Sequence, residues 1–113
     1  MSNRPVGLLI EDMLERIDRV ARYTIGLDRD AFVEDEKTVD AVVRSFEVIG
    51  EAARRLPGEF KAGHNEIPWH QIAGLRNRIV HEYFDVDLGL VWEIATTELP
   101  KLKASLRRLQ SSG

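Results

Sequence analysis

Residues 39–56 read VDAVVRSFEVIGEAARRL, and their apolar side chains recur at the spacing of one helix face. Successive apolar positions lie three, one, three, three, four and three residues apart, at Val39, Val42, Val43, Phe46, Ile49, Ala53 and Leu56. A period near 3.6 residues is typical of an amphipathic α-helix. Asp35 is a candidate N-cap and Pro57-Gly58 ends the pattern, so the sequence predicts a helix over residues 35–56.

The same helical period continues on the N-terminal side of this stretch. It predicts a helix over residues 6–25 that stops at Gly26, and a short helix over residues 28–34. Within the 35–56 helix, Gly50 lies beside two alanines, and such small residues indicate that another helix packs closely there.

On the C-terminal side, the pattern predicts two further helices. After a polar connection over residues 59–67, Pro68 opens a helix that is expected to run from Trp69 to Phe84. A turn and cap at residues 85–87 then lead into a last helix over residues 88–109. Pro100 lies inside this helix, where a proline costs about 3 kcal/mol, so we expect a bend near residues 97–99.

These elements predict a single all-α domain. No stretch shows the sustained alternation of a β-strand. The 113 residues are enough for one domain, which we expect to span 1–113 with a core at about 6–109. The expected architecture is an up-and-down four-helix bundle with one short extra helix.

Composition excludes several classes of function. The formal net charge is −3, so overall positive charge cannot hold nucleic acid, although a small local basic site can. The chain has no cysteine, which excludes disulfides, cysteine-ligated zinc and iron–sulfur clusters. The apolar run before Glu11 is too short for a signal peptide or a membrane span, and we expect a cytoplasmic protein with no membrane partner.

The most unusual local cluster reads RNRIVHEYFD at residues 76–85. On a continuous helix, His81 shares a face with Asn77 four residues earlier and with Arg78 three residues earlier. Arg76 precedes His81 by five residues and lies about 140° away on such a helix. Contact between Arg76 and the surroundings of His81 then needs the long side chain, a distorted helix end or a second subunit.

The residue types in this cluster suit phosphodiester chemistry. Arginine offers a planar fork that matches phosphate oxygens, and histidine exchanges protons near neutral pH. RNA carries its own nucleophile, the 2′-hydroxyl, and no metal-ligand spacing such as HExxH occurs, so we predict no metal site. An arginine-rich helix end is also often a plain solvated face, and the residue types alone leave both interpretations open. Glu47 and Glu51 are expected to be solvated or to pair with nearby arginines.

The cluster resembles a known motif. Residues 76–83, RNRIVHEY, are similar to the Arg-x4-His-x-Tyr motif of the HepT-like family, whose members are minimal proteins of the HEPN superfamily. Segments around it also resemble the family, so that the likeness covers about residues 8–106: FEVIGEAA at 46–53, WHQIAGLRNR at 69–78, VWEI at 91–94 and LPKL at 99–102.

The resemblance implies a HEPN-like helical fold and a specific function. HepT-like proteins are toxin halves of two-gene toxin–antitoxin modules, and the antitoxin is a small MntA-type nucleotidyltransferase. The toxin is an endoribonuclease that needs no metal and no cofactor. It acts as a homodimer in which arginine and histidine from both subunits line a cleft. An RNA substrate follows, with part of a tRNA as one candidate.

The resemblance also assigns roles to individual residues. Arg76 would bind and neutralise the scissile phosphate, and His81 would act as general base or acid. Asn77 would position the phosphate or His81, and Arg78 would support the site by positioning the phosphate. Tyr83 matches the tyrosine that the antitoxin AMPylates with ATP.

A different class of function stays open beside this one. The same cluster would serve a non-catalytic helical module that binds a nucleotide or docks a nucleotidyltransferase. A structural bundle with a surface arginine cluster is the third interpretation. Turnover of phosphodiester bonds separates the first from the other two.

Overall fold

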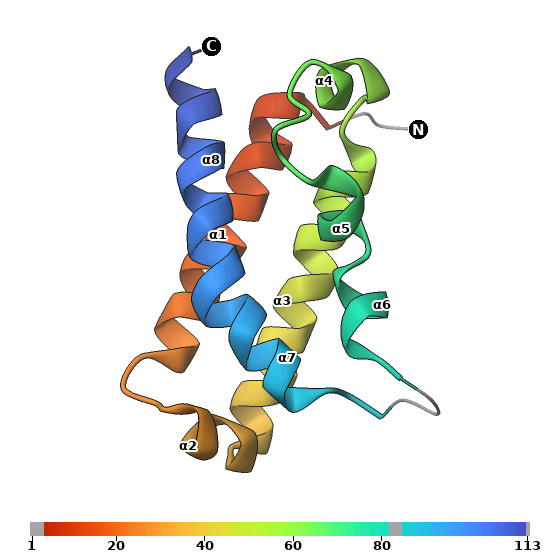
Figure 1. Ribbon diagram of the computed structural model, residues 1–113. Coiled ribbons are helices and arrows are strands. Elements are labelled where there is room, and N and C mark those ends of the chain that lie inside the picture. The colour runs from red at the N-terminus through yellow and green to blue at the C-terminus, as the bar shows by residue number, and fades with distance from the viewer. Residues whose placement is uncertain (1–3, 82–84, 113) are drawn as a thin grey trace.

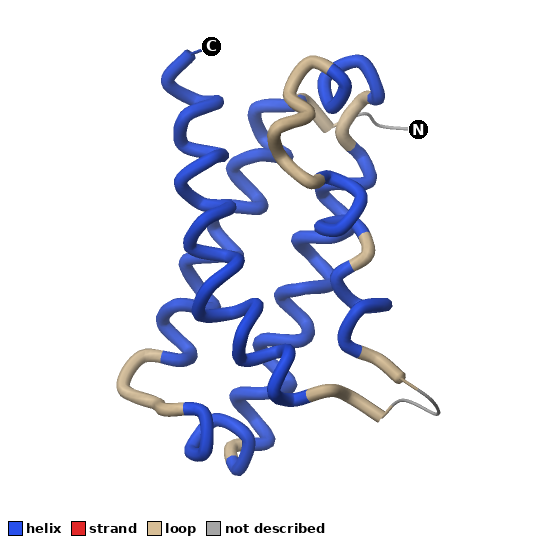
Figure 2. The backbone as a smooth tube through the Cα atoms, viewed as in Figure 1, coloured by secondary structure: helices blue, strands red, loops and turns tan. Residues whose placement is uncertain are grey.

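The computed structural model describes residues 4–81 and 85–112. Within these ranges the chain is helical, and its only extended pairing is an isolated antiparallel bridge between Val80 and Val86. Figures 1 and 2 show helices joined by short loops, with the two chain ends at the same end of the molecule. The predicted all-α class and HEPN-like bundle are confirmed.

Three long helical paths form the body of the bundle. They are α1 (Val6–Thr24), α3 (Glu36–Arg55) and a continuous path made of α7 (Leu88–Glu93), the π-helical η1 (Ile94–Glu98) and α8 (Leu99–Ser112). The predicted short helix is present as α2 (Arg29–Glu34) and lies at one end of the bundle (Figure 1). The helices α5 (Trp69–Ala73) and α6 (Leu75–Ile79) pack against α3.

Local chemistry sets the helix ends where the sequence predicts them. The carboxylates of Asp28, Asp35 and Asp87 each accept a backbone N–H at the third helical position, at 2.8, 3.1 and 3.0 Å. Such caps satisfy donors that the first helical turn leaves free. Gly26 ends the first helical region with φ of +78°, a conformation that glycine adopts without strain.

The fourth predicted helix differs most from expectation. It is not continuous over residues 69–84: α5 ends at Ala73, Gly74 interrupts the path, and α6 ends at Ile79. Glycine is a weak helix former, which makes Gly74 the natural break. Val80 is extended, with φ −99° and ψ 125°, because this β-branched residue pairs with Val86 across a hairpin.

Two smaller differences concern the connection and the proline. The segment predicted as a polar connection contains a one-turn helix, α4 (Gly58–Ala62). The ring of Phe60 in this helix packs against the ring of Trp69, with 6.1 Å between the ring centroids. The irregularity expected near residues 97–99 is the π-helix η1, which extends back to Ile94. Pro100 has no N–H for the regular ladder, and a wider turn directly before it takes up the defect.

The core lies between α1, α3 and the α7–η1–α8 path. Its largest fully buried side chains include Phe32, Phe46, Met13, Ile49 and Leu106. A Cβ at Gly50 would lie 3.1 Å from the carbonyl oxygen of Ala73, so the backbones of α3 and α5 approach closely, as the small residues predicted. This contact fixes α5, and therefore α6, against the middle of α3. Among the described residues, no helix has both the length and the apolarity that crossing a bilayer requires.

Candidate active site

The conspicuous sequence cluster leaves the helix before it reaches its histidine. The backbone N–H of His81 donates to the carbonyl of Asp85 at 2.8 Å, and that of Asp87 donates to the carbonyl of Ile79 at 2.7 Å. His81 therefore lies on the arm of a hairpin, and the expected helix faces that it would share with Asn77 and Arg78 do not exist. The sequence left three ways for Arg76 to reach the surroundings of His81, and a distorted helix end was one of them. The helix end is in fact irregular.

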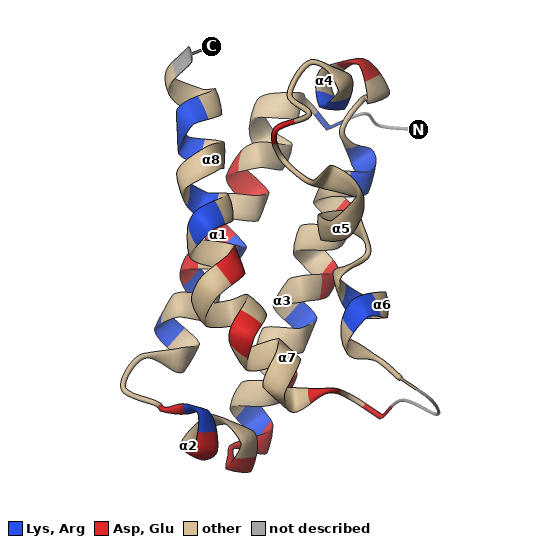
Figure 3. Cartoon of the chain, in the orientation of Figure 1, with Lys and Arg blue, Asp and Glu red and all other residues tan. Residues whose placement is uncertain are grey.

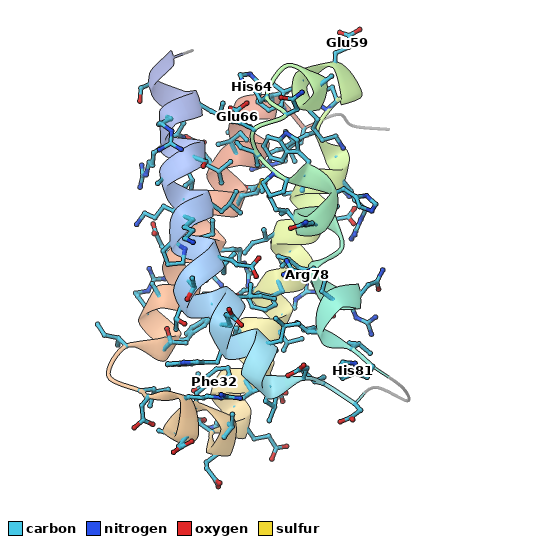
Figure 4. The ribbon with its side chains drawn as sticks, in the orientation of Figure 1. Phe32, Glu59, His64, Glu66, Arg78 and His81 are labelled. Atoms are coloured by element: carbon cyan, nitrogen blue, oxygen red, sulfur yellow. The ribbon has the colours of Figure 1, made fainter. Side chains whose placement is uncertain are left out.

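His81 faces a carboxylate that the return arm of the hairpin carries. Its Nε2 lies 3.4 Å from Oδ2 of Asp87, and the two side chains are 57% and 41% exposed. The other carboxylate oxygen of Asp87 accepts the backbone N–H of Leu90, which fixes the carboxylate at the start of α7. That hydrogen bond is the main cause of a pKa of Asp87 below its ordinary value, and His81 adds to it. Figure 4 shows His81 beyond the end of α6.

Arg76 is held separately from His81. Its Nε lies 3.3 Å from a carboxylate oxygen of Glu47 on α3, and about half of its side chain is exposed. Glu47 also accepts a hydrogen bond from Arg44, so the prediction that it pairs with nearby arginines is confirmed. In the part of the chain that the structure describes, no hydrogen bond or ion pair joins Arg76 to His81.

Arg78 is tied to the last helical path. Its two terminal nitrogens donate to the two carboxylate oxygens of Glu98 at 3.0 and 2.8 Å, a bidentate pair that raises the pKa of the guanidinium above its ordinary value. This pair fastens α6 to η1. Asn77, between the two arginines, is exposed. Tyr83 lies outside the described residues.

The comparison with known families identifies the chain. A family model described as "Ribonuclease HepT-like" matches residues 13–109. The chain belongs to the HepT-like ribonuclease family. The resemblance carried by the Arg-x4-His-x-Tyr motif is thereby confirmed at the level of the family.

Individual relatives carry matching names. A Thermococcus cleftensis protein named "Probable ribonuclease HepT" is 37% identical over 101 residues, which cover 89% of this chain and 92% of that protein. A Caldanaerobacter subterraneus protein named "Putative RNase TTE0752" is 36% identical over 100 residues, or 88% and 89% of the two chains. A Methanocaldococcus jannaschii protein named "Gamma-glutamylcyclotransferase and putative RNase MJ0434" is 38% identical over 106 residues, and this chain spans about half of its length. No solved structure matches the chain.

The sequence alone does not identify Asp87 and Glu98 as partners of the HepT-like motif. Asp87 is visible there as a helix cap, but its contact with His81 depends on a hairpin that the predicted helix excludes. Glu98 gives no signal at all, because it meets Arg78 only after the last helix packs beside α6. Among the described residues, no group of three or more histidine, aspartate or glutamate side chains is arranged to hold a metal ion.

Proposed function

We propose that this HepT-like chain is the toxin of a two-gene module and cleaves RNA without a metal ion. The observation that carries the proposal is a histidine set against a carboxylate, five residues after an arginine of the preceding helix. The family match supports the ribonuclease activity itself. An MntA-type nucleotidyltransferase is the proposed antitoxin, and the cytoplasm the proposed location.

In this proposal, Asp87 sets the role of each nitrogen of His81. An Nε2–H that donates to Asp87 leaves Nδ1 with its lone pair, which suits it to accept a proton. Nδ1 takes the proton of the RNA 2′-hydroxyl as that oxygen attacks the neighbouring phosphorus. The bond from phosphorus to the 5′-oxygen breaks, the imidazolium returns its proton to that oxygen, and the products are a 2′,3′-cyclic phosphate and a 5′-hydroxyl. Asp87 stabilises the imidazolium that forms in between.

Arg76 supplies charge in the proposed reaction. Its guanidinium stabilises the negative charge that builds up on the phosphate oxygens in the transition state. Asn77, exposed on α6, helps to position that phosphate. Arg78 supports the site by clamping α6 to η1, since both of its terminal nitrogens already donate to Glu98.

A homodimer is part of the proposal, because one chain holds Arg76 and His81 on separate partners. We propose that each site combines Arg76 of one subunit with His81 of the other. Mixing the inactive variants Arg76→Ala and His81→Ala then creates heterodimers with one intact site. In a statistical mixture of symmetric dimers, about a quarter of the wild-type rate returns. A mixture as inactive as its components would show that each site uses one chain only.

Control by the antitoxin is proposed to act on Tyr83. The tyrosine oxygen attacks the α-phosphate of ATP, pyrophosphate leaves, and an AMP group remains two residues from His81. Its negative charge and bulk repel an RNA phosphate from the site.

Cleavage of RNA in excess EDTA tests the activity directly. Wild-type protein is expected to cut equally well with EDTA and with added Mg²⁺, and Arg76→Ala to lose most of the rate. Loss of cleavage in EDTA alone would refute the metal-independent reaction. Saturable nucleotide binding with no turnover of RNA would instead support a non-catalytic binding module.

A further inference from the structure

A groove runs beside the candidate active site, along the junction of α3 with α4, α5 and α6. We call it the basic groove, and its polar lining consists of Arg54, Lys61, His70, Gln71, Asn77 and Arg78. Its volume is about 780 Å³. Figure 3 marks basic residues on α3, α4 and α6, the elements that border it. Neither aspartate nor glutamate is among the residues that line it.

The two arginines of the groove are held by carboxylates, whereas its lysine is not. Arg54 donates to the carbonyl of Ala73 and pairs with Glu51 at 2.9 Å, and neither acid that pairs with the groove arginines, Glu51 or Glu98, lines the groove. Lys61 donates only a long hydrogen bond of 3.4 Å, to the carbonyl of Ala53, and has no carboxylate partner among the described residues. Of the three cations that line the groove, Lys61 is therefore the one whose charge no carboxylate among the described residues compensates.

The uncharged polar residues of the lining offer hydrogen-bond donors, but they form no pocket that would select one particular base. The side chains of His70, Gln71 and Asn77 are exposed. Trp69 is only 7% exposed, and its indole N–H donates to the carbonyl of His64, so its ring offers no stacking surface. Contacts of this kind suit the sugar–phosphate backbone and tolerate many sequences.

The groove shares a residue of α6 with the proposed reaction centre. Asn77, which the proposed function assigns to positioning the phosphate, lines the groove. We propose that the basic groove binds the backbone of single-stranded RNA beside the cleavage point, with Lys61 as its main unpaired charge. The inference rests on the proposed ribonuclease function and assigns it a substrate-binding surface.

Binding is measured on full-length protein that carries His81→Ala, so that the RNA stays uncut. A fluorescein-labelled single-stranded RNA of about 20 nucleotides is titrated and followed by anisotropy. Lys61→Glu is the test variant, and Lys37→Glu, on an exposed lysine at the start of α3 outside the groove, is the matched control. Each lowers the net charge of −3 by two. Far-ultraviolet circular dichroism checks that both fold.

Lys61→Glu is expected to weaken binding about tenfold and to reduce the slope of log affinity against log salt by about 0.7, the share of one phosphate contact in single strands. Lys37→Glu is expected to change affinity less than twofold. If Lys61→Glu fails to fold, Lys61→Gln serves in its place, with an expected loss of about threefold.

Three results would overturn the inference: no RNA binding at all, equal effects of the two lysine variants, or equal competition by a polyglutamate peptide. The last would assign the groove to an acidic protein segment. Cleavage by the wild type is scored separately, which keeps the two proposals distinguishable. If the wild type cleaves RNA but the two lysine variants bind it equally well, only the groove proposal fails. If Lys61→Glu alone weakens binding but the wild type cleaves no RNA, only the ribonuclease proposal fails.

Discussion

Asp87 carries two contacts that substitution can separate, since one oxygen caps α7 and the other faces His81. Asn caps a helix about as well as Asp, so Asp87→Asn retains the cap and removes the charge. Asp87→Ala removes both. The first variant therefore tests the contact with His81, and the second supplies the cost of the missing cap.

The geometry sets the size of the effect. The distance of 3.4 Å exceeds the 2.7–2.9 Å or so of a tight charge-assisted hydrogen bond, and both side chains are largely exposed to solvent. Exposed ion pairs are weak, so we expect Asp87→Asn to lower kcat only about fivefold, far from the losses of about 10⁴-fold seen with buried histidine–aspartate pairs. KM is expected to stay within twofold, because the role proposed for Asp87 is to orient His81 and not to bind the substrate.

The assay combines initial cleavage rates on a short fluorogenic RNA with thermal unfolding. Asp87→Asn is expected to unfold near the wild-type temperature, and Asp87→Ala about 4–8 °C lower, the shift for one lost cap in a domain of this size. A wild-type kcat for Asp87→Asn would refute a positioning role and leave Asp87 as a cap only. A change in KM alone would place it in substrate binding.

Three further predictions concern modification, packing and pH. Tyr83→Phe is expected to retain cleavage and to acquire no AMP from the antitoxin and ATP; an adduct of unchanged mass on this variant would exclude Tyr83 as the acceptor. Gly50→Ala is expected to destabilise the fold by about 1–2 kcal/mol in denaturant unfolding, because the new methyl group would lie 3.1 and 3.3 Å from two carbonyl oxygens. Gly7→Ala, which has open space around the new methyl group, is expected to stabilise the fold by about 0.5–1 kcal/mol. Equal changes in stability would contradict the close packing at Gly50. The carboxylates of Asp35, Glu51 and Asp87 have lowered pKa values in the folded chain. Their contribution to stability is complete above the unfolded-state pKa of about 4 and is lost as pH falls through the folded-state values, so the unfolding temperature is expected to drop between about pH 5 and 3. An unfolding temperature that does not change over this range would contradict their contribution.

Local sequence signals were sufficient for most of the fold. The helices near residues 6–25, 28–34 and 35–56 follow from apolar spacing and aspartate caps, which act within a few residues. The close approach at Gly50 was also visible, because a run of small residues leaves room for a neighbouring backbone.

The end of α6 could not be read in the same way. Residues 76–81 fit a helix as well as a hairpin, and the choice depends on Val86, which pairs with Val80 only in the folded chain. The motif residues could be proposed as a site from their types together with the resemblance to HepT-like proteins. Their acidic partners Asp87 and Glu98 could not be proposed, since each contact joins elements whose packing the sequence does not express.

The central claim is that His81 is the proton-transfer group of a metal-independent ribonuclease. The most direct measurement incubates a total tRNA pool with purified protein in EDTA, after mass spectrometry has shown Tyr83 to be free of AMP. Wild type and His64→Ala, a control at another partly exposed histidine, are expected to give the same products, and a folded His81→Ala protein none. Equal cleavage by His81→Ala, or no cleavage by the unmodified wild type, would contradict the account.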